Sequence, residues 1–389
     1  MARRAHLGPP VSLRPRYPPG YAGPVIPDAV PTRPDSPQRV RTWHPGWMGV
    51  VLGTGGAAVA SLVDPLPGTR VDEAVGAALT LLATVGLLLL TPYVLRLRRH
   101  RDAATADLAN PGLGAMYGTA PAALLIVGIA LAQLGMLGWL PDGIAWVSIA
   151  LVVVGVVLAL AVGIAFFLRV VAHEQLPVPA ISGAWFIPIV VLVLVPSGIA
   201  RSVALAPSWS STTALALAAA AWGAGVVLFL LLAPVIAWRL ITYPAPPAHM
   251  AASWWIWLAP AGAGGLGLIA LSRLTSATLG DPVAAVVPTL GLLGASALWG
   301  FAVWWALFAG TVVRRVARAG GGLPFHVGSW GFVFPTAAVA ALTVELGHSW
   351  GSPLLSVVGA VGWFVTLLVW LRLAVQSVGA VRSGALVQR

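Results

Sequence analysis

The segment His44-Pro-Gly-Trp-Met-Gly-Val-Val-Leu-Gly-Thr-Gly-Gly56 opens the first long apolar stretch of the chain. Its glycines leave one side of a helix almost without side chains, which is typical of membrane helices that pack closely or border a path. The rest of the chain is also apolar, because 59% of its 389 residues are hydrophobic and 8% are charged. A soluble domain carries about 25% charged residues. The composition therefore predicts a polytopic membrane protein.

Ten stretches of about 18 residues or more lack charged side chains and could cross the hydrocarbon core as helices. They are residues 46–63, 74–95, 112–138, 144–168, 181–200, 213–237, 252–272, 284–313, 328–344 and 353–371. We predict an all-α integral membrane domain over residues 43–375, with ten transmembrane helices forming five helical hairpins. Residues 1–42 are rich in proline and arginine, which predicts a disordered cytoplasmic tail. Residues 376–389 are expected to form a second, short tail.

Arginine supplies all 22 basic residues, and its distribution predicts the orientation. With the amino terminus inside, fourteen arginines flank the spans on the cytoplasmic side, against Arg70, Arg201 and Arg273 outside. This asymmetry predicts a multi-pass protein of the plasma (inner) membrane with both termini in the cytoplasm. The net charge of +11 then indicates contact with anionic membrane lipid, or attraction of anions to the inner opening. Nucleic acid is not an expected partner, because the arginines are spread over separate loops.

The five odd-numbered spans share a pattern in which bulky residues precede a proline or glycine and small residues follow it. We expect helix breaks at Gly53, Pro121, Pro188, Pro260 and Pro335, spaced by about 70 residues as in an internal repeat. Irregular backbone at membrane depth persists where it packs against protein or lines water. The pattern predicts an inner ring of five broken helices around a central pore, with the evenly apolar spans as an outer ring. For a single break, close helix packing is the alternative.

The expected pore holds few ionisable groups. Glu345, near the outer end of the ninth span, is the acidic residue that could serve proton coupling. The expected pore-lining residues are Gly53, Thr54, Gly55, Thr119, Pro121, Pro188, Pro260, Phe332, Pro335 and Thr336. Small side chains, threonines and backbone groups make only weak contacts with an ion, which favours conduction over tight binding. The partial positive charge at the ends of broken helices favours anions over cations. The absence of cysteine excludes thiolate metal sites and c-type haem attachment, and we expect neither a metal nor a cofactor.

Two motifs resemble a known family. They are residues 44–55 and the segment Phe325-His-Val-Gly-Ser-Trp-Gly-Phe-Val-Phe-Pro335, supported by Asn110-Pro-Gly, Gly118-Thr-Ala-Pro121 and Trp185-Phe-Ile-Pro188. Over approximately residues 43–375, the chain resembles the tellurite-resistance/dicarboxylate transporter family of the voltage-dependent anion channel superfamily. That family includes bacterial TehA, plant slow anion channels, and fungal malate and sulfite transporters.

The resemblance implies a homotrimer with one pore per subunit and conduction or efflux of small inorganic or organic anions. It also implies a phenylalanine in the ninth span that blocks the pore. Phe334 matches that phenylalanine, with Phe332 as the second candidate and a packing aromatic as the alternative. The sequence leaves the identity of the anion open.

Other function classes compete with an anion channel. A secondary carrier could export dicarboxylate or sulfite, with proton coupling through Glu345. A membrane glycosyltransferase could use Asp64, Asp72 and Glu73 of the first outer loop, but no large outer domain accompanies them. A haem or quinone subunit would need facing histidine pairs inside the bilayer. The seven histidines instead lie in the tail, in loops or at span ends, and we do not expect an enzyme.

Overall fold

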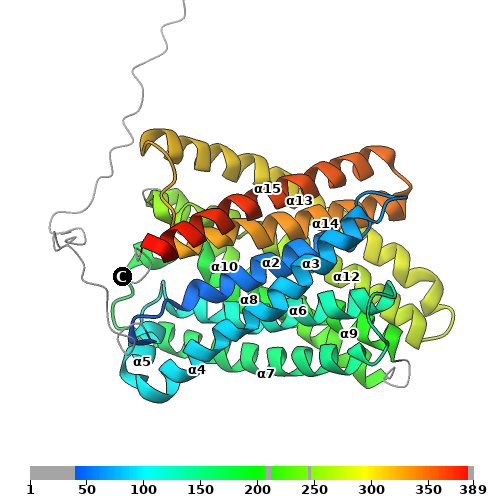
Figure 1. The fold of residues 1–389 in the computed structure, drawn as a ribbon, viewed down its shortest axis with the longest axis horizontal. Helices are drawn as coiled ribbons and strands as arrows, with labels where there is room; N and C mark the ends of the chain where they lie inside the picture. The colour runs from blue at the N-terminus through cyan, green and yellow to red at the C-terminus, as the bar shows by residue number, and fades with distance from the viewer. Residues whose placement is uncertain (1–39, 207–211, 244–246, 384–389) are drawn as a thin grey trace, which may run out of the picture.

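A computed structural model describes residues 40–206, 212–243 and 247–383. The expected amino-terminal tail, up to residue 39, lies outside the described residues. Within them the chain is helical, and long helices run side by side along the horizontal axis of Figure 1. Eight helical stretches of the described residues are long and apolar enough to cross a membrane. The protein is therefore a multi-pass membrane protein.

These eight stretches correspond to eight of the predicted spans. They are Val71–Arg99, Gly114–Met136, Ile144–Val171 (α7), Thr212–Thr242 (α10), Ala248–Thr278, Val283–Ala319 (α13), Val327–Trp350 and Pro353–Ser383 (α15). The other two predicted spans are shorter as α-helices. The first is α2 (Met48–Ser61), and the fifth is divided into α8 (Ile187–Val193) and α9 (Val195–Leu205).

Several of the stretches are composite. The stretch from Val71 contains α3 (Val71–Gly86), the 3₁₀ turn η2 (Leu87–Leu89) and α4 (Leu90–Arg99), and the short helix α5 (Arg101–Ala109) follows it. The odd-numbered spans open with 3₁₀ turns or a short helix before their main α-helix. These openings are η1 (Pro45–Trp47), η3 (Gly114–Gly118), η5 (Gly183–Phe186), η7 (Ala248–Met250) with α11 (Ala252–Trp255), and η8 (Val327–Phe332). The main helices of the third, seventh and ninth spans are α6 (Thr119–Met136), α12 (Leu258–Thr278) and α14 (Val333–Trp350).

Burial alternates along the chain. In the most apolar window of each stretch, 89% of the residues are buried for Gly114–Met136, 78% for Ala248–Thr278 and 67% for Val327–Trp350. The corresponding share lies between 11% and 22% for the stretches that contain α3, α7, α10, α13 and α15. Helix α2 is buried along almost its whole length. The evenly apolar helices therefore form the exterior of the described structure, as their composition predicts.

The buried helices pack against one another as well as against their exposed neighbours. Contacts join α2 with α6, α6 with α9, α9 with α12, α12 with α14, and α14 with α2. Each buried helix also contacts the exposed helix that follows it in the chain, as α14 contacts α15. Figure 1 shows the blue helix α2 near the orange helix α14, so early and late parts of the chain meet in the centre.

The breaks expected in the odd-numbered spans are not interruptions inside α-helices, and this prediction is wrong. Gly53 lies within the continuous helix α2. Pro121, Pro260 and Pro335 are third residues of α6, α12 and α14, and Pro188 is the second residue of α8. N–H groups in a first turn have no intrahelical partner, so proline costs no hydrogen bond there. The four prolines therefore lie in the first turns of α-helices that follow 3₁₀ turns or a short helix.

Tryptophan N–H groups join neighbouring helices through hydroxyl groups. On α15, Trp363 donates to Ser61 (2.8 Å) and Trp370 to Thr54 (2.9 Å), both in α2. Each hydroxyl also donates to the carbonyl four residues earlier in its own helix, so its donor and an acceptor site are used. The same arrangement pairs Trp255 with Thr336, Trp299 with Thr343, Trp330 with Ser377, and Trp350 with Ser296. These bonds fix the rotation of each helix about its axis, because a buried polar group without a partner is costly.

The carboxyl-terminal boundary also differs from the prediction. Helix α15 continues to Ser383, so the boundary expected at residue 375 falls inside a helix. The hydroxyl of Ser377 accepts a hydrogen bond from the indole of Trp330 at 3.0 Å. The helix therefore still packs on the domain beyond the predicted boundary.

Arg96 does not belong to the basic rim to which the sequence assigns it. It is 2% exposed and forms an ion pair with Asp107 of α5. It also donates to the carbonyl of Trp43 (2.8 Å) and to the hydroxyl of Tyr117 (3.2 Å). This buried charge is thus paired and hydrogen-bonded, as burial of an ion requires. It ties α4 and α5 to the starts of the first and third spans.

Candidate functional site

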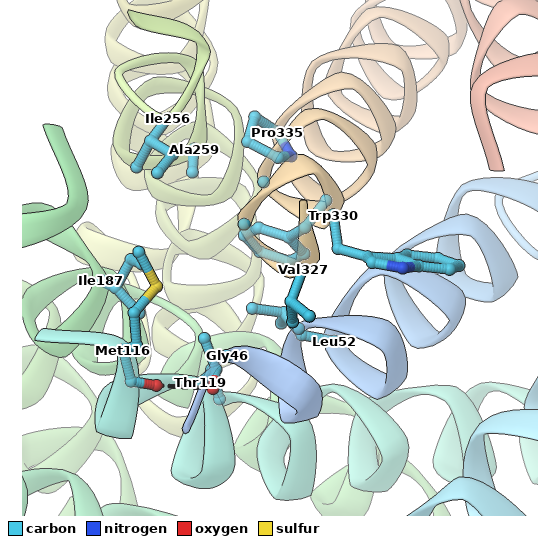
Figure 2. A pocket seen from close by; sticks show the side chains of 15 residues that line it. Gly46, Leu52, Met116, Thr119, Ile187, Ile256, Ala259, Val327, Trp330 and Pro335 are labelled. Carbon is cyan, nitrogen blue, oxygen red and sulfur yellow. Dashed lines mark hydrogen bonds between the residues drawn. The ribbon is translucent and has the colours of Figure 1, made fainter. Parts of the chain in front are cut away.

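A cavity lies at one end of the buried helices, which we call the histidine end after His44, His249 and His326. The ring centroids of His44 and His326 are 5.3 Å apart, and those of His249 and His326 are 6.0 Å apart. Figure 2 shows side chains of several helices gathered around this cavity. The lining residues of this histidine-side cavity are Gly46, Gly49, Leu52, Met116, Thr119, Ala122, Ile187, Ile256, Ala259, Val327, Gly328, Trp330, Gly331, Phe334 and Pro335. All five odd-numbered spans contribute to this list.

Two histidines hold the backbone at this cavity in the same way. The Nδ1 atoms of His44 and His326 accept hydrogen bonds from the N–H groups of Gly46 and Gly328, each at 3.0 Å. They cap η1 and η8, whose first N–H groups lack backbone partners. Burial, and secondarily the neighbouring His249, lowers the pKa of His326. A lowered pKa favours the neutral ring, in which Nδ1 can remain an acceptor.

Phe334 separates the histidine-side cavity from a second cavity, which we call the middle cavity. The residue is 5% exposed and lines both cavities. A Cβ atom built on Gly56 would lie 2.9 Å from Cδ2 of Phe334, so glycine provides the space for the ring. The remaining lining of the middle cavity is Gly56, Val59, Ile126, Ile129, Leu194, Ser197, Arg201, Ala263, Leu266, Ala337, Ala338 and Ala341.

Arg201 in turn joins the middle cavity to a third one at the opposite end of the buried helices. It lines both cavities. The third, which we call the Arg273-side cavity, is lined by Gln133, Met136, Ala200, Arg201, Val203, Ala204, Ala270, Arg273, Leu274, Ala277 and Glu345. The three cavities therefore form a series in which Phe334 and Arg201 are the shared residues.

The cavities beside Phe334 are small. The histidine-side cavity has a volume of about 50 Å³ and the middle cavity about 20 Å³. Since one water molecule needs about 10–15 Å³ by this measure, the first has room for a few waters and the second for about one. Their linings are mostly apolar. Neither cavity therefore has room for an ion with its full hydration shell.

The structure brings three of the predicted path residues to the histidine-side cavity: Thr119, Phe334 and Pro335. The hydroxyl of Thr119 lies 2.7 Å from the carbonyl of Met116 and 3.3 Å from that of Pro45, so its single donor is used within the protein. Thr54 and Thr336 instead accept indole hydrogen bonds from Trp370 (2.9 Å) and Trp255 (2.8 Å). Neither of these two threonines lines any of the three cavities.

The other predicted lining residues make packing contacts, and none of them lines the three cavities. A Cβ atom on Gly53 would lie 2.9 Å from the ring of Trp330, and one on Gly55 2.6 Å from Ile126. The remaining four residues also lie at helix contacts or in the interior. Pro188 abuts Gly118, the carbonyl of Pro121 lies near Gly155, Pro260 is buried, and the ring of Phe332 is 6.1 Å from that of Trp255.

Glu345 lies in the Arg273-side cavity, where it has a basic partner. Its carboxylate accepts from Arg273 at 2.8 Å and 3.3 Å. The side chain of Arg273 is 59% exposed, and that of Glu345 is 15% exposed. The residue considered for proton coupling is therefore held in an ion pair within this cavity.

The acidic residues of the first loop have structural partners. The carboxylate of Asp72 is buried and accepts from the N–H of Leu66 at 3.3 Å. Glu73 accepts from the indole N–H of Trp139 at 2.8 Å. Asp72 thus fastens the loop before α3, and Glu73 joins the first turn of α3 to the turn that follows α6. Both side chains therefore have a role that needs no sugar substrate.

Residues 42–378 match the model of the voltage-dependent anion channel family. The chain belongs to this family. The resemblance inferred from the two motifs is therefore confirmed, and the family comprises channels and transporters rather than enzymes.

Individual relatives agree with this membership. An uncharacterised transporter of Methanocaldococcus jannaschii is 30% identical over 312 residues, which cover 78% of this chain and 83% of the relative. A second uncharacterised transporter from the same organism is 25% identical over 357 residues, which cover 89% of this chain and 97% of the relative. A sulfite efflux pump of Trichophyton rubrum is 25% identical over 342 residues, which cover 85% of this chain and 88% of the relative. The chain is thus similar to membrane transporters over most of its length.

Sequence reasoning missed the place of Arg201 in the series of cavities. The predicted fifth span ends at residue 200, which puts Arg201 in an outer loop. Helix α9 continues to Leu205 and carries Arg201 to the cavities. A signal for this was present, because after Arg201 the first helix-stopping residue in the sequence is Pro207.

Proposed function

We propose that the protein is a channel-like exporter of small anions, whose path runs through the three cavities and whose gate is Phe334. The observation that carries this proposal is the position of the Phe334 side chain between the histidine-side and middle cavities. An anion can pass from one to the other only if the ring moves. Rotation of a single side chain is a small rearrangement, which is compatible with a gate in an otherwise well-packed helix bundle.

The path is proposed to run inside a ring of five helices. The closed series of contacts from α2 through α6, α9, α12 and α14 back to α2 supports this ring. The exposed helices α3, α7, α10, α13 and α15 would form the outer layer. In this proposal the first of ten spans consists of η1 and α2, and the fifth consists of α8 and α9. The ten spans then form five hairpins.

The chemistry of the lining supports passage rather than storage of an anion. The histidine-side cavity has small and apolar side chains, and an ion there loses water without gaining a strong ligand. Such a constriction blocks ions sterically and by denying them hydration, and it conducts once it is widened and wet. The arginine distribution supports a cytoplasmic histidine end, and we propose that orientation in the plasma membrane.

The relatives support an anionic substrate and narrow the choice of probe. Fungal relatives that are 25% identical to this chain are sulfite efflux pumps. Sulfite is therefore the first anion to test, followed by chloride and dicarboxylates. We also propose assembly as a homotrimer with one path per subunit, which the mass of the detergent-solubilised protein can test.

The gate is tested by anion flux in proteoliposomes with wild type, Phe334→Ala and Phe332→Ala. Phe332 is the matched control, because it is also an aromatic residue near Pro335 but packs beside Trp255. We expect Phe334→Ala to raise sulfite or chloride flux at least about tenfold, as removal of a steric block should. Phe332→Ala should leave the flux within about twofold of wild type. Equal flux in wild type and Phe334→Ala would refute the gate.

A secondary carrier is the second candidate, and the position of Glu345 in the Arg273-side cavity favours it. A carrier coupled to protons would need a group that gains and loses a proton in each cycle. Glu345 instead accepts two hydrogen bonds from Arg273 and is held in an ion pair. We therefore place the channel first.

A further inference from the structure

Arg201 is the ionic residue that reaches furthest into the series of cavities. It is partly buried on α9, and its side chain lines both the middle and the Arg273-side cavities. Phe334 lines the other boundary of the middle cavity. An anion on this path would therefore meet Arg201 and the Phe334 gate on opposite sides of one small space.

The guanidinium of Arg201 is held in place but only partly used. Its Nε–H donates to Oε1 of Gln133 at 2.6 Å, and Nη1 donates to the carbonyl of Ser197 at 3.2 Å. A guanidinium has five N–H donors, so three remain after these two bonds. They include both donors on Nη2, for which the described part of the chain provides no acceptor within hydrogen-bond distance.

No ion pair within the described part of the chain neutralises the positive charge of Arg201. Glu345, the acidic residue in the same cavity, pairs with Arg273 instead. The ionic lining of the Arg273-side cavity therefore carries an excess of one positive charge. A partly buried cation of this kind is stabilised if an anion binds beside it.

Two polar neighbours would complete such a site. Because Oε1 of Gln133 accepts from Arg201, its amide nitrogen is left as a donor, and Gln133 lines the Arg273-side cavity. Ser197 lines the middle cavity and brings a hydroxyl group, a further possible donor. Donors therefore flank the guanidinium on both sides, which is the arrangement that an anion requires and a cation does not.

We infer that Arg201, with Gln133 and Ser197, forms a binding site for an oxyanion on the far side of Phe334 from the histidine end. This inference rests on the proposed path and adds a selectivity site to it. The planar guanidinium matches two oxygens of an oxyanion with parallel hydrogen bonds, whereas a halide offers one acceptor centre. The site therefore prefers sulfite-like oxyanions or carboxylates to chloride. The hydrogen bonds that Arg201 donates to Oε1 of Gln133 and to the carbonyl of Ser197 hold the guanidinium in position for this contact.

The test compares two variants that remove the same charge. Arg201→Gln and Arg273→Gln each lower the charge of the Arg273-side cavity by one, but Arg273 does not line the middle cavity. Sulfite flux is measured against sulfite concentration in the Phe334→Ala background, so that the gate does not limit it. We expect Arg201→Gln to raise the half-saturating concentration about tenfold or more, as loss of a charge-assisted hydrogen bond should. Arg273→Gln should change it less than about threefold.

Arg201→Lys separates charge from shape, because lysine keeps the charge without the planar fork. In Arg201→Lys, chloride flux should equal that of the protein that keeps Arg201. The half-saturating sulfite concentration should stay raised, as in Arg201→Gln. Complete rescue of sulfite by lysine would overturn the oxyanion preference. Equal effects of Arg201→Gln and Arg273→Gln would overturn the site itself, because general electrostatics would then explain both.

A binding measurement distinguishes failure of this site from failure of the proposed function. Sulfite should raise the melting temperature of the purified full chain in detergent, since a ligand that binds the folded state stabilises it. This shift should be lost in Arg201→Gln and kept in Arg273→Gln. A sulfite-dependent shift without any flux would refute transport and support the site. Flux without an Arg201-dependent shift would refute the site and support transport.

Discussion

Phe334 in α14 lies directly against the backbone of Gly56 in α2. A Cβ atom at residue 56 would come within 2.9 Å of Cδ2 of the ring, a distance that real Cβ atoms do not reach. The glycine-rich first span and the phenylalanine of the ninth span therefore form one steric contact. Any larger residue at position 56 must displace the ring that separates the two cavities.

This contact predicts strong coupling between Gly56→Ala and Phe334→Ala. In the wild-type background, Gly56→Ala should destabilise the protein by about 1–3 kcal/mol, the usual effect of overpacking. In the Phe334→Ala background the clash is absent, and the same change should stabilise by up to about 1 kcal/mol, since alanine is the better helix residue. Thermal unfolding of the four proteins in detergent measures this cycle.

Gly264→Ala is a matched control for this cycle. A Cβ atom there would lie 3.7 Å from its nearest neighbour, Leu298, which is an ordinary contact. It should be neutral or stabilising in both backgrounds. Additive effects of Gly56→Ala and Phe334→Ala would contradict the close approach of the two residues.

The buried ion pair of Arg96 and Asp107 should matter far more for stability than an exposed one. Asp107→Asn leaves a buried guanidinium without its charge partner, for which we expect a loss of about 3–5 kcal/mol. In the exposed pair Arg41–Asp102 the side chains are 53% and 61% exposed, so water screens the two charges and Asp102→Asn should have little effect on stability. Thermal or denaturant unfolding of the two variants checks the difference. Similar losses would show that burial of the first pair has no energetic consequence.

The histidine cap of η8 predicts a pH dependence of stability. Burial lowers the pKa of His326 below that of the unfolded chain, about 6.5, so the folded state binds fewer protons. The stabilisation is therefore complete above about pH 6.5 and is lost as the pH falls through the lower folded pKa. Protonation would also remove the Nδ1 acceptor that Gly328 uses. The melting temperature should fall as the pH is lowered below about 6.5.

His326→Asn is the control for this dependence. Asn110 already accepts from the N–H of Gly112 at 2.9 Å in an equivalent position, so asparagine can keep the cap without titrating. The variant should lose the part of the acid sensitivity that His326 contributes. An unchanged pH profile would show that His326 does not titrate in this range.

Glu345→Gln separates the channel from the carrier. Since Arg273 is 59% exposed, the ion pair should contribute less than about 1 kcal/mol, and the variant should fold normally. For a channel, anion flux should stay within about twofold of wild type and should not follow an imposed pH gradient. Flux measurements in proteoliposomes with opposite pH gradients provide the check. Wild-type flux that follows the gradient and disappears in Glu345→Gln would establish the carrier.

The regular spacing of residues such as Pro188 and Pro260 revealed five related segments, because a repeat is visible without any knowledge of packing. The same pattern was misleading about the local backbone. A proline that interrupts a helix and one that lies in its first turn look alike in a sequence, because the distinction depends on where the helix begins. Thr54 shows a second limit. A small polar residue suits a path, but its orientation depends on Trp370, which is far away in the chain.

The sequence by itself determined the membrane class, the exposure of the evenly apolar helices, and the importance of the motifs around Gly56 and Phe334. These follow from composition and periodicity, which local physical chemistry fixes. Only the tertiary structure decided which side chains share a cavity. It placed Arg201 in the lining of two cavities, paired Arg96 with Asp107, and turned Thr54 toward α15. The reason is that the rotation of a membrane helix about its axis is set by hydrogen bonds and close contacts with distant segments.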